Sequence, residues 1–358
     1  MSGNSIFSEP RWLTGRLTRL GPAERIRLHA AVFGVSLLWL FIVFVAASLD
    51  GTLTLSGHGR GFLQHRGYTA VHLATPVALS LSLLALDTFS RLMGRLQDFV
   101  VPGHDIQDLE KCRDEHLAIV NLKSRWTWLL LLFITCGAMC SIVIFSQVIE
   151  PGKTYGNDVF NALHYPLGYY TANIYLAISW SVVFPLSLFL VLQITAAIVV
   201  ILGRARQRGS LFVDLLHTDN CGGLSPFGNL NLLLMLYYVP PFLAMLALAA
   251  THSQRYASLL IPAVVLSLVF LAQSSIGVYA IRLAIQAEKS KRLESLHDEL
   301  KQALYQPLNR AGQEVTFLLW QHVRGVKTMP YAAKAHIFVE VLRYVPPFIA
   351  VLNILRAE

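Results

Sequence analysis

Six apolar segments, each close to the length of a membrane-crossing helix, dominate this sequence. A helix needs about 20 apolar residues to cross the hydrocarbon of a bilayer. The segments that meet this requirement are residues 28–47, 71–89, 126–148, 174–203, 230–250 and 258–281. Only 14% of the 358 residues are charged, whereas soluble domains have about 25%. The sequence therefore predicts an all-α, polytopic helical membrane protein with six transmembrane helices.

The distribution of Lys and Arg predicts how these helices are oriented. All but four of the 29 Lys and Arg residues fall in the N-terminal tail, the second and fourth connecting loops and the C-terminal region. Because positive residues concentrate on the cytoplasmic side, both termini are expected in the cytoplasm. The predicted organisation is a cytoplasmic basic tail (1–27), a six-helix membrane domain (28–281) with cytoplasmic loops at about 90–125 and 204–229, and a cytoplasmic helical region (282–358).

The same charge bias also bears on location and partners. It suits a multi-pass protein of the bacterial inner membrane. The net charge of +8 is explained by topology, since the basic residues flank apolar segments instead of forming one soluble face. The lipid bilayer is therefore the predicted partner, and nucleic acid is not.

The C-terminal region continues the sixth segment as a charged helix with an apolar stripe. Leu293, Leu296, Leu300 and Leu304 recur at spacings of three and four residues, which is typical of a helix with one buried face. We expect this stripe, from Leu293 to Leu304, either to join copies of the chain into a homo-oligomer or to pack on other cytoplasmic segments. Residues 337–355 are also apolar, but their central charges favour a cytoplasmic or interfacial helix over a seventh span.

The loop between the fourth and fifth segments has the most distinctive composition in the chain. It contains the ligand-binding or gating candidates His217, Asp219, Cys221, Gly222 and Gly223. Two glycines permit close approach of the backbone to a ligand. His217, Asp219 and Cys221 alternate, so an extended segment would place all three on one face, where they could hold a transition metal. The other interpretation is a tight structural turn between two spans. We therefore predict no metal site in this loop.

Polar but uncharged residues inside the spans suggest a second group of candidates. Gln193, Gln273 and Ser274 either line a water-filled path or hydrogen-bond neighbouring helices. Prolines at Pro240 and Pro241, and also within the second and fourth spans, remove backbone hydrogen bonds and can kink the helices. These residues are the predicted pore lining: Gln193, Pro240, Pro241, Gln273 and Ser274.

These features favour two classes of function and disfavour a third. The leading hypothesis is an oligomeric, channel-like pore with a ligand-responsive cytoplasmic loop. The alternative is a membrane-anchored sensor or scaffold that recruits a cytoplasmic partner without transport. Only His217, Asp219 and Cys221 approach a catalytic grouping, so neither an enzyme nor a cofactor is predicted.

Overall fold

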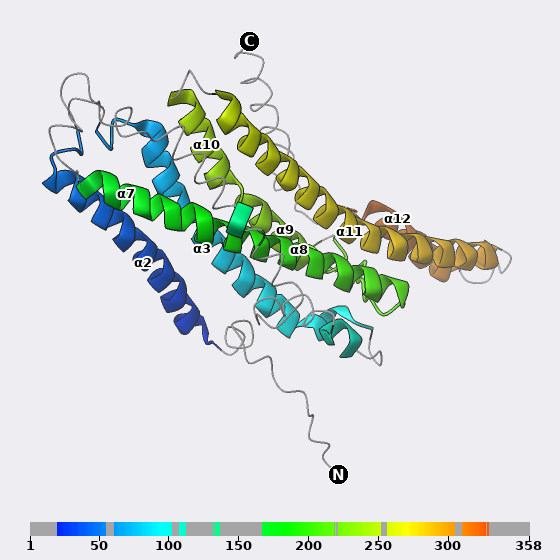
Figure 1. Cartoon of the computed structure of the whole chain (residues 1–358). Helices are drawn as coiled ribbons and strands as arrows, with labels where there is room; N and C mark the ends of the chain where they lie inside the picture. Colours follow the sequence, from blue (N-terminus) through cyan, green and yellow to red (C-terminus); the bar gives the residue numbers. More distant parts are fainter. Residues whose placement is uncertain are drawn as a thin grey trace.

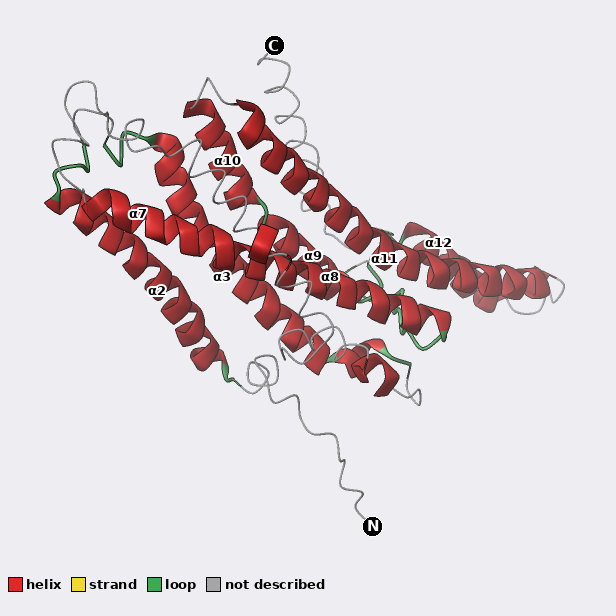
Figure 2. Ribbon diagram, in the orientation of Figure 1, coloured by secondary structure: helices red, strands yellow, loops and turns green. Residues whose placement is uncertain are grey.

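The computed structural model is a bundle of tilted helices from which one long helix and its partner extend (Figure 1). It describes residues 20–54, 61–101, 107–111, 132, 134–136, 167–217, 219, 221–251, 256–304, 310–326 and 328. No strand occurs in these ranges, where loops connect the helices (Figure 2). The main helices are α2 (Pro22–Leu49), α3 (Arg66–Gly94), α7 (Leu167–Ile178), α8 (Phe184–Gln207), α9 (Ser225–Leu236), α10 (Val239–Thr251), α11 (Tyr256–Leu304) and α12 (Arg310–Gly325).

Five helical stretches among the described residues are long and apolar enough to cross a membrane. They coincide with five of the six predicted spans, which agrees with a multi-pass helical membrane protein. Helix α2 shows the character of such a span most clearly. It is apolar on all sides, and Val35, Leu38 and Phe41 are 67%, 58% and 61% exposed. A helix of this kind needs lipid around it.

Several predictions fall outside the described residues. The third predicted span at 126–148 lies almost wholly outside them, as do the segment 337–355 and most of the N-terminal tail. The predicted continuation of the sixth span is confirmed, because α11 runs through 49 residues from Tyr256 to Leu304 as one helix.

The helices bury two clusters of apolar side chains, one toward each end of the bundle. The first involves α2, α3, α7 and α10, and includes Val43, Tyr175 and Met245. The larger one joins α3, α8, α9 and α11 with the loop that follows α8. We refer to the second end, where α2 and α9 begin and α3 and α8 end, as the basic end. It contains the arginines that flank these helices.

Prolines have different effects on different spans. Helix α3 continues through Pro76 without a break. In the fourth span, the π-helical turn η4 (Ser179–Val183) lies directly before Pro185, where the missing N–H and the ring disturb the preceding turn. The fifth span is divided into α9 and α10 at Tyr237–Tyr238, just before Pro240 and Pro241. The predicted interruption at this pair is therefore present.

Helix α12 packs along the distal part of α11 (Figure 1). Leu296, in the centre of the leucine stripe, is completely buried in the larger cluster. The Nζ of Lys289 donates to the carbonyl oxygens of Arg324 and Val326 at 2.7 Å each, which fixes the end of α12. Leu293 and Leu296 of the stripe thus pack within their own chain, and self-association through the stripe stays a prediction.

The contact between α2 and α7 provides a test of the packing. The N–H of Gly168 donates to the Asp50 carboxylate, and a Cβ at Gly168 would overlap the backbone of Ala47. We expect Gly168→Ala to separate the helices and to lower the free energy of unfolding by about 1 to 3 kcal/mol. Gly34→Ala in α2 is the matched control, because a Cβ there meets no atom. Thermal unfolding in detergent measures both, and equal stability of the two variants would contradict this packing.

Candidate functional site

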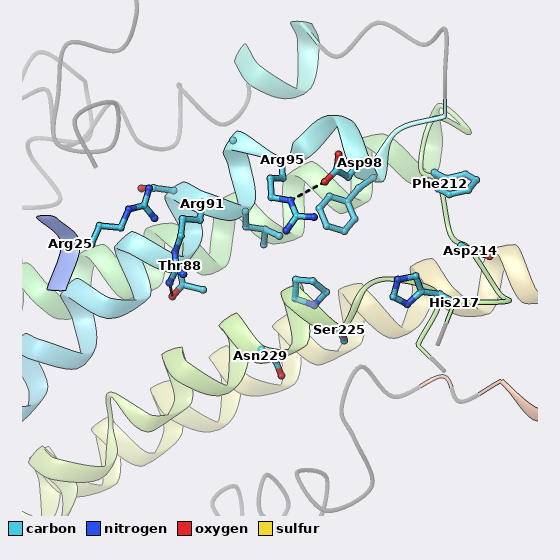
Figure 3. A pocket seen from close by; sticks show the side chains of 17 residues that line it. Arg25, Thr88, Arg91, Arg95, Asp98, Phe212, Asp214, His217, Ser225 and Asn229 are labelled. Atoms are coloured by element: carbon cyan, nitrogen blue, oxygen red, sulfur yellow. Dashed lines mark hydrogen bonds and ion pairs between the residues drawn. The ribbon is translucent and has the colours of Figure 1, made fainter. Parts of the chain in front are cut away.

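A cleft of about 800 Å³ opens at the basic end, between α3 on one side and α9 on the other (Figure 3). The first turn of α2 contributes Arg25, and the last turn of α3 contributes Arg91. Arg95 follows directly after α3. The opposite wall consists of the loop after α8 and the start of α9, including His217 and Ser225. Helices far apart in the sequence therefore meet around one concave site.

The arginines at one end of the cleft are held by a buried carboxylate. Asp87 of α3 is 4% exposed, and its Oδ1 lies 3.2 Å from Nη1 of Arg25. Its Oδ2 lies 3.3 Å from Nη2 of Arg91 and 3.6 Å from Nε2 of His29. The Oδ1 contact lacks hydrogen-bond geometry, so it is an ion contact only. Two guanidinium groups from different helices thus converge in front of one carboxylate.

A second set of contacts closes the far end of the cleft. Arg95 donates from Nε to Asp98 Oδ2 at 2.9 Å. Beyond it, Val100 and Leu211 form a single antiparallel β-bridge. The N–H of Phe212 donates to the carbonyl oxygen of Phe99 at 2.9 Å. This bridge fastens the segment after α3 to the segment after α8.

The diglycine in the loop after α8 is required by its backbone conformation. Gly222 and Gly223 have φ angles of +69° and +79°, which favour glycine. A Cβ at Gly222 would also overlap Cγ1 of Val213, whereas one at Gly223 would make an ordinary contact with the ring of His217. The two glycines allow the loop to fold tightly beneath the cleft.

Asp219 organises the same loop and the start of α9. Its Oδ1 accepts from the N–H groups of Cys221 and Gly223 at 2.8 and 3.1 Å, and its Oδ2 accepts from Ser225 at 3.2 Å. Burial opposes ionisation of this carboxyl and is the largest single influence, but the hydrogen bonds together lower its pKa below the usual value. Asp219 therefore caps the first amide of α9, that of Ser225, and satisfies two amides of the loop before it.

The structure separates the five candidates that the sequence identifies in this loop. His217, Gly222 and Gly223 line the cleft. Asp219 lies beneath them, with Oδ1 3.0 Å from His217 Nδ1, and Cys221 is buried. The described residues contain no group of three His, Cys, Asp or Glu side chains that could hold a metal, so the metal interpretation of the loop gains no support there.

The predicted pore residues lie elsewhere, within the spans. Nε2 of Gln273 in α11 donates to Thr195 Oγ1 of α8 at 2.9 Å, and Ser274 donates to the Leu271 carbonyl at 3.0 Å. Pro240 and Pro241 lie in the first turn of α10, which begins at Val239. In the part of the chain that the structure describes, Oε1 of Gln193 and of Gln273 are buried without hydrogen-bond partners.

Sequence reasoning missed the arginines of the cleft. Arg25, Arg91 and Arg95 contributed only to the count of basic residues that predicts the orientation of the helices. Their spacing contains one local indication, because Asp87 and Arg91 are four residues apart and so lie on one face of α3. The convergence of Arg25 on that face depends on the tertiary structure.

Comparison of this chain with models of protein families, with curated proteins and with solved structures found no match.

The role of Asp219 can be tested by hydrogen exchange. Asp219→Ala should increase exchange of the Cys221, Gly223 and Ser225 amides about 5- to 30-fold, the effect of losing a helix cap. Because the pKa of Asp219 is lowered, the native chain should keep this protection from about pH 5 upward and lose it as the carboxylate is protonated at lower pH.

Asp214→Ala is the control for this experiment. Among the hydrogen bonds of the described residues, Asp214 Oδ1 accepts one, from the N–H of Leu216 at 3.0 Å. This substitution should increase exchange of the Leu216 amide and leave the Cys221, Gly223 and Ser225 amides protected. Equal exchange in both variants would exclude Asp219 as the cap.

Proposed function

We propose that this protein is a membrane-anchored sensor that binds a small phosphate-bearing anion in the cleft at its basic end. The observation that supports it is the convergence of Arg25 and Arg91, from two different helices, at the wall of this cleft. Guanidinium groups are planar donors that match phosphate oxygens in pairs. By the distribution of Lys and Arg, the cleft opens on the cytoplasmic side.

The packing offers a route from the cleft to the rest of the chain. Ser225 and Asn229 of α9 line the cleft. Asn231, two residues further on, packs so closely on α11 that a Cβ at Gly277 would overlap its Oδ1. Helix α11 then continues without a break to the contact with α12. A ligand that moves the start of α9 therefore acts on the helix that leaves the bundle.

A channel-like pore is the second candidate, and one observation favours it. The fifth span is broken at Tyr237–Tyr238, and the Tyr238 hydroxyl is buried without a hydrogen-bond partner among the described residues. Within the described ranges, Oε1 of Gln273 in the sixth span also has no hydrogen-bond partner. A broken helix beside unpaired polar groups suits a water-filled path, although the Gln273 amide also joins two helices.

The sensor proposal predicts specific loss of anion binding. In Arg91→Gln, one charged donor is removed from the cleft, and we expect the affinity for inorganic phosphate to fall about 10-fold. Arg206→Gln is the matched control, because Arg206 is exposed at the same end of the bundle and does not line the cleft. Ligand-induced thermal stabilisation of the purified chain measures both. An equal loss of phosphate affinity in the two variants would show that the effect comes from general surface charge and not from the cleft.

The pore candidate predicts that Gln273→Leu changes the single-channel conductance of the reconstituted protein, since an amide that lines a path contacts the permeating ion or water. Gln302→Leu, at an exposed position of the same helix, should leave the conductance as it is. A current unaffected by Gln273→Leu would remove this residue from the path, and the absence of any current would remove the pore.

A further inference from the structure

Three helices independently place the cleft at the depth of the lipid headgroups. The apolar segment of α2 begins at Leu28, about one turn after Arg25. That of α3 ends at Phe89, two residues before Arg91. The apolar segment of the fifth span begins at Leu230, directly after Asn229 in the cleft wall. Because the ends of apolar spans coincide with the edge of the hydrocarbon, the cleft lies level with the phosphate groups of a bilayer.

The buried carboxylate holds the two arginines ready for an anion. Asp87 is almost inaccessible, whereas the side chains of Arg25 and Arg91 are 15% and 51% exposed. Nη2 of Arg91 also contacts Thr88 Oγ1 at 3.2 Å. Figure 3 shows Arg25, Thr88 and Arg91 grouped at one end of the cleft. Fixed guanidinium groups lose less conformational freedom when they bind a phosphate.

The lining of the cleft also favours an amphiphile over a soluble phosphate. Leu92, Phe99, Phe212 and Pro226 contribute to its walls. Beside it, α2 presents exposed apolar side chains along its length. A soluble phosphate bound at Arg25 and Arg91 would leave the exposed apolar surface of α2 uncovered, whereas the acyl chains of a lipid would lie along it. Basic pockets between membrane helices on the cytoplasmic side are typical sites for anionic headgroups.

We infer that the cleft binds the headgroup of an anionic phospholipid, with its phosphate between Arg25 and Arg91 and its acyl chains along α2. This inference rests on the proposed anion-binding function and identifies the source of the anion as the membrane itself. The ligand would then enter sideways from the bilayer, and α2 would be the helix that it contacts first.

The test uses the full chain in nanodiscs of phosphatidylcholine that contain a minority of phosphatidylglycerol. Native mass spectrometry measures which lipid stays bound after the nanodisc is removed. We expect phosphatidylglycerol to be retained in preference to phosphatidylcholine, and its retention to fall about 10-fold in Arg91→Gln. Arg206→Gln should retain it as the native chain does. Arg95→Gln, at an exposed position of the cleft, provides a second variant if Arg91→Gln does not fold.

The outcomes separate this inference from the proposed function. Binding of inorganic phosphate without preference for phosphatidylglycerol would make the cleft a site for soluble anions, which overturns the inference and leaves the sensor proposal standing. Binding of neither probe would overturn both. Equal loss of phosphatidylglycerol in the Arg206→Gln control would assign the retention to general surface charge and overturn the inference.

Discussion

Asp87 is the charge on which the assembly of the basic end depends. A carboxylate buried beside apolar spans is unfavourable unless cations compensate it, and removal of one partner of such a pair costs about 3 to 5 kcal/mol. Arg25, His29 and Arg91 supply this compensation. Because Arg25 and His29 belong to α2, the least buried of the five candidate spans among the described residues is tied to α3 at this end. At its other end, Asp50 accepts from Gly168 of α7. Polar contacts at both ends thus hold a helix whose middle faces lipid.

The loop after α8 is held by hydrogen bonds from backbone amides to a carboxylate, whereas Asp87 is held by ion pairs with side chains. Asp219 accepts from two amides of the loop and from the first amide of α9, and the Leu224 carbonyl accepts from the amides of Phe227 and Gly228. The helix N-terminus is therefore not left open for an anion, and the guanidinium groups on the opposite wall provide the positive charge instead. Gly222 and Gly223 keep the loop compact, so that the cleft stays open above it.

The sequence predicted features that depend on composition along the chain, and it missed those that depend on contacts across it. Apolar length was sufficient for the five spans that the described residues cover, and the apolar stripe after residue 281 predicted the extension of α11. The break before Pro240 followed from the missing N–H of proline. In contrast, one of the two interpretations of the loop, an extended segment with His217, Asp219 and Cys221 on one face, assumed that no local hydrogen bonds form. The side chain of Asp219 accepts from three nearby backbone N–H groups, which curls the loop. The meeting of Arg25 with Asp87 joins residues 62 positions apart, which no local pattern encodes.

Helix α11 has a mechanical consequence, because it is one rigid rod of 49 residues, about 74 Å long. The portion beyond residue 281 extends about 35 Å from the apolar segment and holds α12 against its side. A change of only about 5° in the tilt of this rod within the bilayer would displace its far end by about 3 Å. The span and the α11–α12 pair therefore have the geometry of a lever, in which a small change of tilt in the apolar segment would become a larger displacement of the α11–α12 pair.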